Sequence, residues 1–202
     1  YSLTDSTTRR PGLVKACASR GLPAVAVTDQ SNLFALVKFY KAAQSAGIKP
    51  IAGADVLAEM EDGSLAHFTL LCRDRQGYLN LSQLLTAGWL DGHQGDHVRV
   101  KSDWIETHAE GLFLLAGRRS DIGRLVGEQK FDHAEAALQR WRKRFDDRCC
   151  LELSRSGFDD EALFNQAAQW LAARQGCAAI ISNDVRFIDQ DGFDAHEARV
   201  CI

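Results

Sequence analysis

The feature that most constrains the fold is a regular alternation of short apolar runs with segments of helical periodicity. Strands that alternate with helices at this pace favour parallel pairing, because a parallel connection needs a crossover of a dozen or more residues. The alternation therefore predicts an α/β fold, built as a barrel or a doubly wound sheet. The predicted strands are Ala24–Thr28, Pro50–Leu57, His67–Arg73, Leu112–Ala116, Cys150–Leu153 and Ala178–Ser182.

Seven segments with helical spacing accompany these strands. In the segment that starts at Leu33, apolar residues at positions 33, 36, 37 and 40 predict one buried face. The segment from Asp132 begins with an acidic residue and ends in Arg and Lys, which suits the helix dipole. The predicted helices are Gly12–Arg20, Leu33–Ala46, Arg75–Thr86, Ser120–Val126, Asp132–Phe145, Asp159–Arg174 and Phe193–Val200, and the stretch from Leu90 to Trp104 is predicted as a long loop.

The composition fits one folded domain in a reducing compartment. With 202 residues, of which 46% are hydrophobic, the chain can bury one sizeable core. A net charge of −3 gives no support to a surface that binds nucleic acid all over. No stretch approaches the roughly 18 apolar residues of a membrane span, and no secretory signal opens the chain. The six cysteines contain no C-x-x-C pair, so we expect free thiols and a cytoplasmic protein.

Both ends of the sequence look interrupted. The first residue is Tyr1 and not Met, and the chain stops at Ile202 inside an apolar pattern. We therefore expect residues 1–202 to be one domain that is cut from a longer protein and incomplete at both ends.

Polar residues gather just past several predicted strands. Asp29 and Gln30 follow "AVAVT", "PIAG" leads to Asp55, "LFLLAG" leads to Arg118, and "AIIS" leads to Asp184. In α/β barrels the carboxyl ends of the strands converge on one face, where catalytic residues collect. The pattern indicates an ancestral site there. The competing interpretation is that every strand must end somewhere polar.

The longest continuous pattern is "AVAVTDQSNLFALVKFYKAAQSAGIKPIAGADV", and four more phrases accompany it in a fixed order. These are "YSLTD", "AHFTLLCRDRQGYLNL", "GLFLLAG" and "ISNDVRFIDQDGFDAHEARVCI". Together they resemble the polymerase and histidinol phosphatase (PHP) domain of the bacterial DNA polymerase III alpha subunit family. The resemblance spans residues 1–202 and implies a distorted (β/α)7 TIM-like barrel. It also implies that a first strand with a His-x-His pair precedes Tyr1, and that the polymerase domains follow Ile202.

Intact PHP domains, as the resemblance implies, hold up to three metal ions and hydrolyse phosphoesters. Histidine nitrogens and carboxylates would bind the ions, which activate water and neutralise charge on a phosphoryl group. In this sequence the matching positions are Asp5, Asp29, Gln30, Asp55, His67, Arg118, Asp184 and Arg186. A further histidine position falls on Ser156.

Several of these positions carry the wrong chemistry for a metal site. Gln30 and Arg186 replace histidines, Arg118 replaces a cysteine, and Asp55 is one methylene shorter than the expected glutamate. A neutral amide is a poor ligand for zinc or manganese, and a guanidinium has no lone pair to offer. We therefore predict a vestigial site without catalytic residues and without a bound metal. Asp5, His67 and Asp184 are the residual candidates for metal binding.

The two arginines suggest a replacement for the lost ions. A guanidinium can form bidentate pairs with carboxylates, so Arg186 and Arg118 are predicted to pair with Asp5, Asp29, Asp55 or Asp184. The simpler alternatives are that Asp184 is a turn residue and that His67 is a structural histidine at the start of a strand.

The resemblance implies a function and a rival. The main hypothesis is a non-catalytic scaffold that docks the proofreading exonuclease subunit and the remaining alpha-subunit domains. The parent would be a DNA-directed DNA polymerase that uses Mg²⁺ and contacts DNA, with no membrane partner. The rival is a metal-dependent phosphoesterase or 3′–5′ exonuclease that uses Zn²⁺ or Mn²⁺. A free-standing phosphatase is a third, weaker option.

Overall fold

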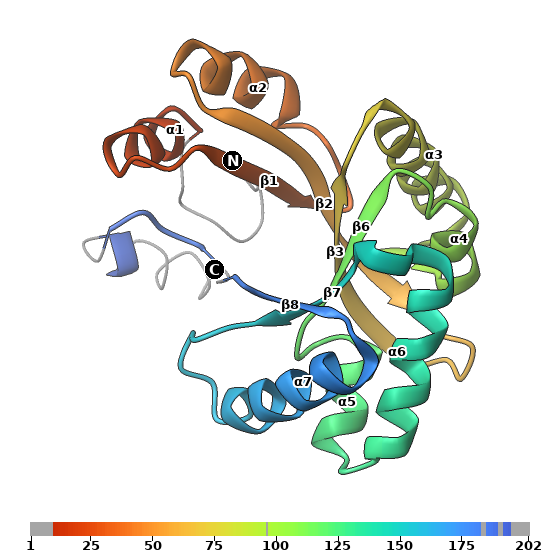
Figure 1. Ribbon diagram of the computed structural model, residues 1–202. Coiled ribbons are helices and arrows are strands. Elements are labelled where there is room, and N and C mark those ends of the chain that lie inside the picture. The colour runs from red at the N-terminus through yellow and green to blue at the C-terminus, as the bar shows by residue number, and fades with distance from the viewer. Residues whose placement is uncertain (1–9, 96, 183–184, 190–191, 195–202) are drawn as a thin grey trace. The chain divides into compact units, whose positions relative to one another are not determined.

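The computed structural model describes residues 10–95, 97–182, 185–189 and 192–194. The chain, coloured by residue number in Figure 1, divides into two compact units. The first unit comprises Tyr1–Ala54 and Asp184–Ile202, and the second comprises Asp55–Asn183. Asp5 and Asp184 of the predicted site lie outside the described residues, as does most of the predicted helix Phe193–Val200.

In its described residues, the first unit contains two helices that contact each other and two paired strands. Its elements are α1 (Arg10–Ser19), β1 (Ala24–Gln30), α2 (Leu36–Ser45) and the beginning of β2 (Lys49–Glu59), and β1 pairs with β2. These elements confirm the helices and strands predicted for this part of the sequence, with small shifts at their ends. The buried core of the unit consists of Val14, Cys17, Leu36, Phe39, Ala43 and Ile48.

The buried face of α2 differs from the predicted face. Leu36, Phe39 and Ala43 are buried, whereas Val37 is 66% exposed and Tyr40 is 45% exposed. The inward face follows the spacing 36, 39 and 43, and Val37 and Tyr40 lie one residue further along, on the side turned to solvent. The prediction that Val37 and Tyr40 share the buried face is therefore wrong.

The second unit holds most of the sheet, with five α-helices and one 3-10 helix of the described chain. Its elements are the end of β2, β3 (Leu65–Cys72), α3 (Arg75–Asp91), β4 (His93–Gln94), β5 (His97–Lys101), α4 (Ser102–Thr107), β6 (Leu112–Ala116), α5 (Asp121–Gly127), α6 (Phe131–Phe145), η1 (Asp146–Arg148), β7 (Cys149–Leu153), α7 (Glu161–Gln175) and β8 (Ala178–Ile181). The fold is thus mixed α/β.

The sheet mixes parallel and antiparallel pairs. Its strand order is β4-β5-β2-β3-β6-β7-β8. The pairs β2–β5, β6–β7 and β7–β8 are parallel, but β3 runs antiparallel to β6, with Thr69 opposite Leu115. The expectation of parallel pairing is therefore wrong at β3. A short turn joins β2 to β3, closed by the Met60 N–H donating to the Ser64 carbonyl at 2.8 Å, so no crossover helix intervenes.

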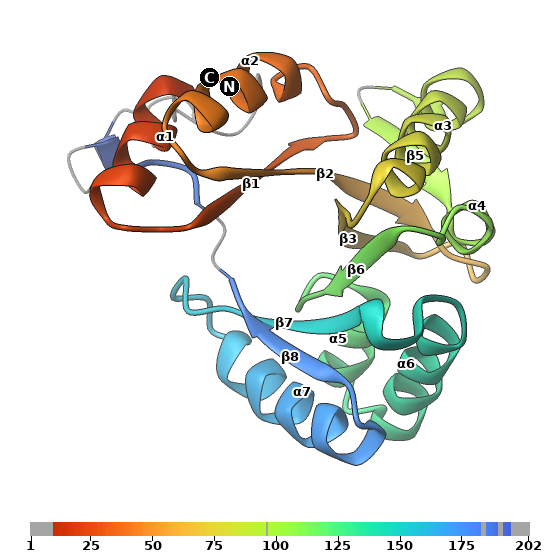
Figure 2. The ribbon, with the colours of Figure 1, turned by 45° about the horizontal axis from the view of Figure 1, so that its top comes forward.

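Helices cover the sheet of the second unit. Helices α5, α6 and α7 lie together beside β7 and β8 in Figure 2, and α3 contacts β3, β5 and β6. The core includes an edge-on contact between Phe68 of β3 and Trp141 of α6, whose ring centroids are 4.9 Å apart. The fully buried Trp141 donates its indole Nε1–H to Asp121 Oδ2 at 3.0 Å. This bond gives the buried polar end of the indole a partner.

The predicted long loop from Leu90 to Trp104 contains ordered elements. Strands β4 and β5 pair antiparallel across a turn in which Gly95 has a φ of +59°. Val98 and Val100 of β5 are buried, which is the period-2 pattern of a half-buried strand. Helix α4 then begins at Ser102. The loop prediction is wrong because His97–Lys101 alternates buried with more exposed side chains and pairs with His93–Gln94.

Two glycines let the start of α3 pass close to the start of β6. A Cβ atom on Gly77 would lie 1.9 Å from the carbonyl oxygen of Gly111, and Gly111 itself has a φ of +71°. The Asp74 side chain caps α3 by accepting the Gly77 N–H at 3.0 Å. Only glycine fits both positions without moving the backbone.

Candidate functional site

Asp29 lies within β1. The sequence had predicted that the strand ends at Thr28 and that Asp29 follows it. Its side chain is buried, and Oδ2 accepts the backbone N–H of Ala35 at 3.1 Å. Ala35 immediately precedes α2, so the carboxylate lies near the positive end of that helix. This bond holds the connection between β1 and α2. Asp29 thus has a structural role in addition to any role in a site.

The connection after β1 is a compact turn that begins at Gln30. The Gln30 carbonyl accepts the Asn32 side-chain N–H at 2.8 Å, and Asn32 Oδ1 accepts the Phe34 N–H at 3.0 Å. Ser31, between them, has a φ of +54°. Asn side chains commonly close turns in this manner. Gln30 is therefore held by its backbone at the position where the family resemblance expects histidine.

Arg186 lies in the described segment 185–189 of the first unit and is half-buried. In this segment Asp189 forms an ion pair with Arg20, which directly follows α1. Arg20 Nη2 and Asp189 Oδ1 are 2.8 Å apart. The predicted pairs of Arg186 with Asp5 and Asp184 involve residues outside the described part of the chain. The role of Arg186 as a counter-ion stays a prediction.

In the second unit, Asp55 bonds to Thr69, which shares a face of β3 with His67. Asp55 Oδ1 accepts the Thr69 hydroxyl at 2.5 Å. His67 and Thr69 are two residues apart on β3, so their side chains leave the same face of the strand. This face is half-buried, whereas Ala66, Phe68 and Leu70 fill the core on the other face.

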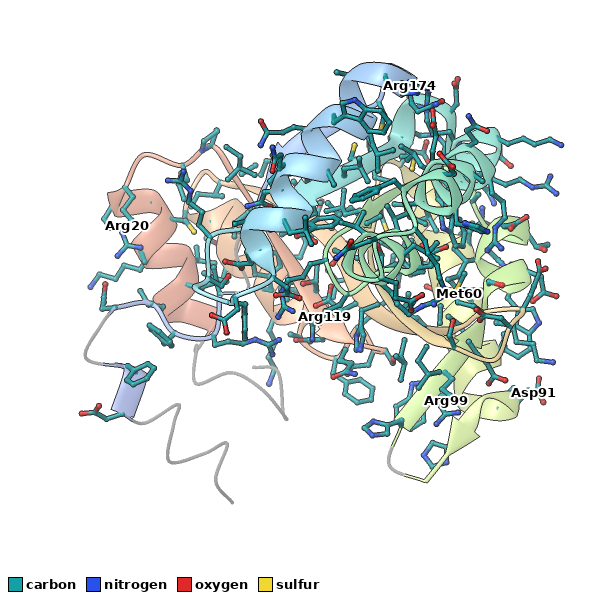
Figure 3. All side chains as sticks on the ribbon, turned by 90° about the horizontal axis from the view of Figure 1, so that it is seen from below. Arg20, Met60, Asp91, Arg99, Arg119 and Arg174 are labelled. Carbon is teal, nitrogen blue, oxygen red and sulfur yellow. The ribbon has the colours of Figure 1, made fainter. Side chains whose placement is uncertain are left out.

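His67 is surrounded by groups that disfavour its protonation. Burial lowers the pKa of its imidazole, and the positive charge of Arg119 and the neighbouring His97 lower it further. Arg119, which is labelled in Figure 3, belongs to the connection between β6 and α5. Its carbonyl accepts the His67 backbone N–H at 2.9 Å. His67 is therefore held as a neutral imidazole at neutral pH.

Arg118 has a partner that was not predicted. Its Nη1 lies 3.2 Å from Asp160 Oδ2, and its guanidinium carbon lies 3.9 Å from the centroid of the Phe158 ring. Both contacts come from the connection between β7 and α7. Asp160 is not among the four carboxylates predicted as partners of Arg118, which were Asp5, Asp29, Asp55 and Asp184. The planar guanidinium suits both contacts, since it can stack and form an ion pair at once.

Sequence reasoning missed Glu161, a buried carboxylate beside Ser156. Glu161 accepts the backbone N–H groups of Ser156 and Gly157 and the hydroxyl of Ser154, at 2.8 to 2.9 Å. Burial alone would raise the pKa of Glu161, but these hydrogen bonds outweigh it and lower the pKa to about 2. The local signal was a "SRSG" turn followed by an acid at the start of a helix. Ser156 contributes its backbone here, as part of a loop anchored by Glu161.

The metal cluster that the family resemblance implies falls only partly within the described residues, because Asp5 and Asp184 lie outside them. Within residues 10–95, 97–182, 185–189 and 192–194, no group of three His, Cys, Asp or Glu residues is placed to hold an ion. Arg118 cannot donate a lone pair to an ion, whereas the Asp29 carboxylate accepts one backbone N–H on Oδ2 and keeps further lone pairs. Asp29, Gln30 and Arg186 belong to the first unit, and Asp55, His67 and Arg118 to the second.

Comparison with known proteins gives consistent similarities along the chain. The family model described as "PHP domain" matches residues 1–156. The chain is 48% identical to the DNA polymerase III subunit alpha of Xylella fastidiosa strain Temecula1, 43% to that of Pseudomonas aeruginosa and 40% to that of Escherichia coli K12. Each alignment covers 100% of this chain and 18% of the relative. The chain therefore spans about a fifth of the length of these curated relatives.

Solved structures share the fold. A candidate metal-dependent phosphoesterase from Bifidobacterium adolescentis superimposes with a TM-score of 0.64 at 12% identity, over 98% of this chain and 93% of that one. An amidohydrolase from Chromobacterium violaceum, solved with sulfate and no metal, gives 0.56 at 17% identity, over 98% and 94%. At such identities the likeness concerns the fold alone. Among the described helices, none has the length and apolar character required to cross a membrane.

Proposed function

Because the chain belongs to the PHP domain family, we propose that it serves as the PHP domain of a replicative DNA polymerase alpha subunit. The observation that carries this proposal is identity of 40–48% to polymerase III alpha subunits along the whole chain. The whole protein would be a DNA-directed DNA polymerase that works on DNA in the cytoplasm. Its nucleotidyl transfer would use Mg²⁺ in domains other than this one.

The architecture we propose is the distorted (β/α)7 barrel of PHP domains. The alternation of strands and helices from β1 to β8 supports it, as does the likeness to a phosphoesterase of known structure. The antiparallel pair β3–β6 is one source of the distortion.

We propose that the domain has lost its own phosphoester hydrolysis and acts as a scaffold. Two features support this. Arg118, at a position that the resemblance assigns to a metal ligand, instead forms an ion pair with Asp160 and stacks on Phe158. Gln30, at a histidine position, offers an amide that binds zinc or manganese poorly. A cationic arginine in such a place repels a metal ion.

The partner proposed for the scaffold is the proofreading exonuclease subunit. The test is a titration of the purified protein, with any flanking polypeptide that it naturally carries, against that subunit by isothermal calorimetry. We expect saturable binding with one exonuclease per chain. An unrelated nuclease of similar charge is the control. Heat changes equal to those of the control at high micromolar concentration would remove the docking role.

A second candidate function is residual metal-dependent phosphoester hydrolysis. The observation that favours it is His67, whose lowered pKa leaves a lone pair available for Zn²⁺ or Mn²⁺ at neutral pH. Elemental analysis before and after chelation tests it, together with hydrolysis of a phosphodiester substrate. The variant His67→Ala, with His108→Ala as control, assigns any activity to this site. About one ion per chain and activity lost in His67→Ala alone would favour hydrolysis over the scaffold.

A further inference from the structure

Two cysteines face each other where β7 and β8 begin. The parallel register pairs Cys150 with Ala178, so one step earlier Cys149 stands opposite Cys177. Neighbouring strands lie about 4.8 Å apart, and opposite residues of a parallel pair point to the same face of the sheet. A disulfide requires Cα atoms about 4.4 to 6.8 Å apart. The register therefore places these two residues within bridging range.

The side-chain contacts support this placement. Cys177 Sγ donates to the Cys149 carbonyl oxygen at 3.0 Å, and both side chains are free thiols. Cys149 is 1% exposed, whereas Cys177 is half-buried and can be reached from solvent. Cys150, the next residue on β7, points to the opposite face of the strand. One buried and one accessible thiol thus share one site.

The charges around the two thiols make them chemically unequal. Hydrogen bonding with Cys149 lowers the pKa of Cys177 to about 7, and the positive charge of Arg142 contributes to the same effect. The same interaction and burial raise the pKa of Cys149. Arg142 is held in place because its Nη1 donates to the Gln175 carbonyl, two residues before Cys177. Cys177 is therefore the thiol of the pair that ionises more readily, and on ionisation it gives up its hydrogen bond to the Cys149 carbonyl, while Cys149 stays protonated.

We propose that Cys177 and Cys149 form a reversible redox pair, in which a peroxide oxidises Cys177 and Cys149 then closes a disulfide. The Cys177 thiolate attacks one peroxide oxygen, the O–O bond breaks, and the departing hydroxide takes up a proton to become water. Cys177 is left as a sulfenic acid. The Cys149 sulfur then attacks the Cys177 sulfur and expels a second water. Two thiols lose two electrons, and the peroxide gains them.

The other described cysteines lack these features. Burial raises the pKa of Cys72 to about 11, with the Asp74 charge adding to the effect. Burial also raises the pKa of Cys17 and of Cys150. A bridge between Cys177 and Cys149 would reopen with a dithiol reductant by thiol–disulfide exchange.

The experiment maps cross-linked peptides after oxidation. The purified protein, with any natural flanking polypeptide, receives one equivalent of hydrogen peroxide at pH 7.5, is alkylated, and is digested with trypsin. Cleavage after Arg148 and Arg174 yields the peptides 149–155 and 175–186, which mass spectrometry can find joined. We expect the joined pair in the wild type and in Cys150→Ser. It should be absent in Cys149→Ser and Cys177→Ser, and lost from the wild type on adding dithiothreitol.

Reactivity gives a second measurement that does not depend on any variant. At pH 7.5 Cys177 should react with iodoacetamide at least about tenfold faster than Cys72, because the thiolate is the reacting species. Thermal melts of each variant show whether it folds. A joined pair that persists in Cys149→Ser, oxidation of Cys177 to sulfinic acid without a joined pair, or equal alkylation rates would each overturn the proposal.

Discussion

Trp141 and Asp121 form a buried hydrogen bond in the core of the second unit, with Nε1 3.0 Å from Oδ2. Asp121 is 4% exposed and Trp141 is fully buried. Burial is the main reason that the pKa of Asp121 is raised, and the Trp141 N–H partly offsets this effect. A polar pair of this kind is costly to break, because removing one partner leaves the other buried and unsatisfied.

Replacing Asp121 tests this pair. Asp121→Leu should lower the free energy of unfolding by about 1–3 kcal/mol, since it leaves the indole N–H unpaired. Asp121→Asn keeps an oxygen acceptor and should lie within about 1 kcal/mol of the wild type. The raised folded-state pKa means that the wild type loses stability relative to Asp121→Asn as pH rises from 3.8 through that raised pKa. Urea unfolding at pH 4 and pH 7 measures both effects, and equal costs for Leu and Asn would contradict the pairing.

Glu161 should stabilise its loop at neutral pH and fail to do so in acid. The folded-state pKa of about 2 lies below the ordinary value of 4.5, so its contribution is complete above 4.5 and disappears as pH falls toward 2. Glu161→Gln places an amide N–H₂ near backbone donors and should cost about 1–3 kcal/mol at pH 7. The exposed Glu110→Gln is the control. A deficit of Glu161→Gln that is the same at pH 7 and pH 2.5 would argue against this role.

The pKa of His67 should respond to its neighbours in a fixed order. Arg119→Gln should raise the pKa of His67, and His97→Gln should raise it less, since the Arg119 charge is the larger cause. Both variants should leave the pKa below 6.5, because burial is the first cause. Arg73→Gln is an exposed control. Proton NMR titration of the imidazole checks the order.

The same residue should affect stability in mild acid. With a folded-state pKa below 6.5, the native state binds fewer protons than the unfolded state as pH falls from 6.5. The wild type should lose stability there, and His67→Gln should lose less over the same interval. Parallel loss curves for the two proteins would show that His67 does not carry the effect.

Arg118 should behave as a surface ion-pair residue and not as a buried counter-ion. Its partner Asp160 is 58% exposed, so a double-mutant cycle of Arg118→Gln with Asp160→Asn should give a coupling of about 0–1 kcal/mol. Loss of the stacking on Phe158 would add about 0.5–1 kcal/mol to the cost of Arg118→Gln. A cost above about 3 kcal/mol would instead indicate a charge that neutralises buried carboxylates.

The sequence predicted most strands and helices because their periodicities are local. The strand containing Ala178 to Ile181 and the helix ending at Phe145 follow directly from such patterns. The direction of β3 could not be read in this way, because it depends on the short turn after Met60 and not on composition.

The site was less accessible to sequence reasoning. Asp160 is 42 residues from Arg118, so no spacing rule joins them, and their contact depends on the packing of the β7–α7 connection. Glu161 was missed because a carboxylate at the start of a helix usually faces solvent, whereas this one turns back onto three donors. The resemblance located the family positions but could not supply their partners.

The close crossing of Gly77 and Gly111 has a consequence for engineering. The two glycines and the Asp74 carboxylate interlock, because a methyl group at Gly111 would also come within 2.5 Å of Asp74 Oδ1. A segment graft or a chimera with a junction between positions 74 and 111 must therefore take Asp74, Gly77 and Gly111 from the same parent. Chimeras that split these three residues would misfold even when every exchanged segment is sound in its own parent.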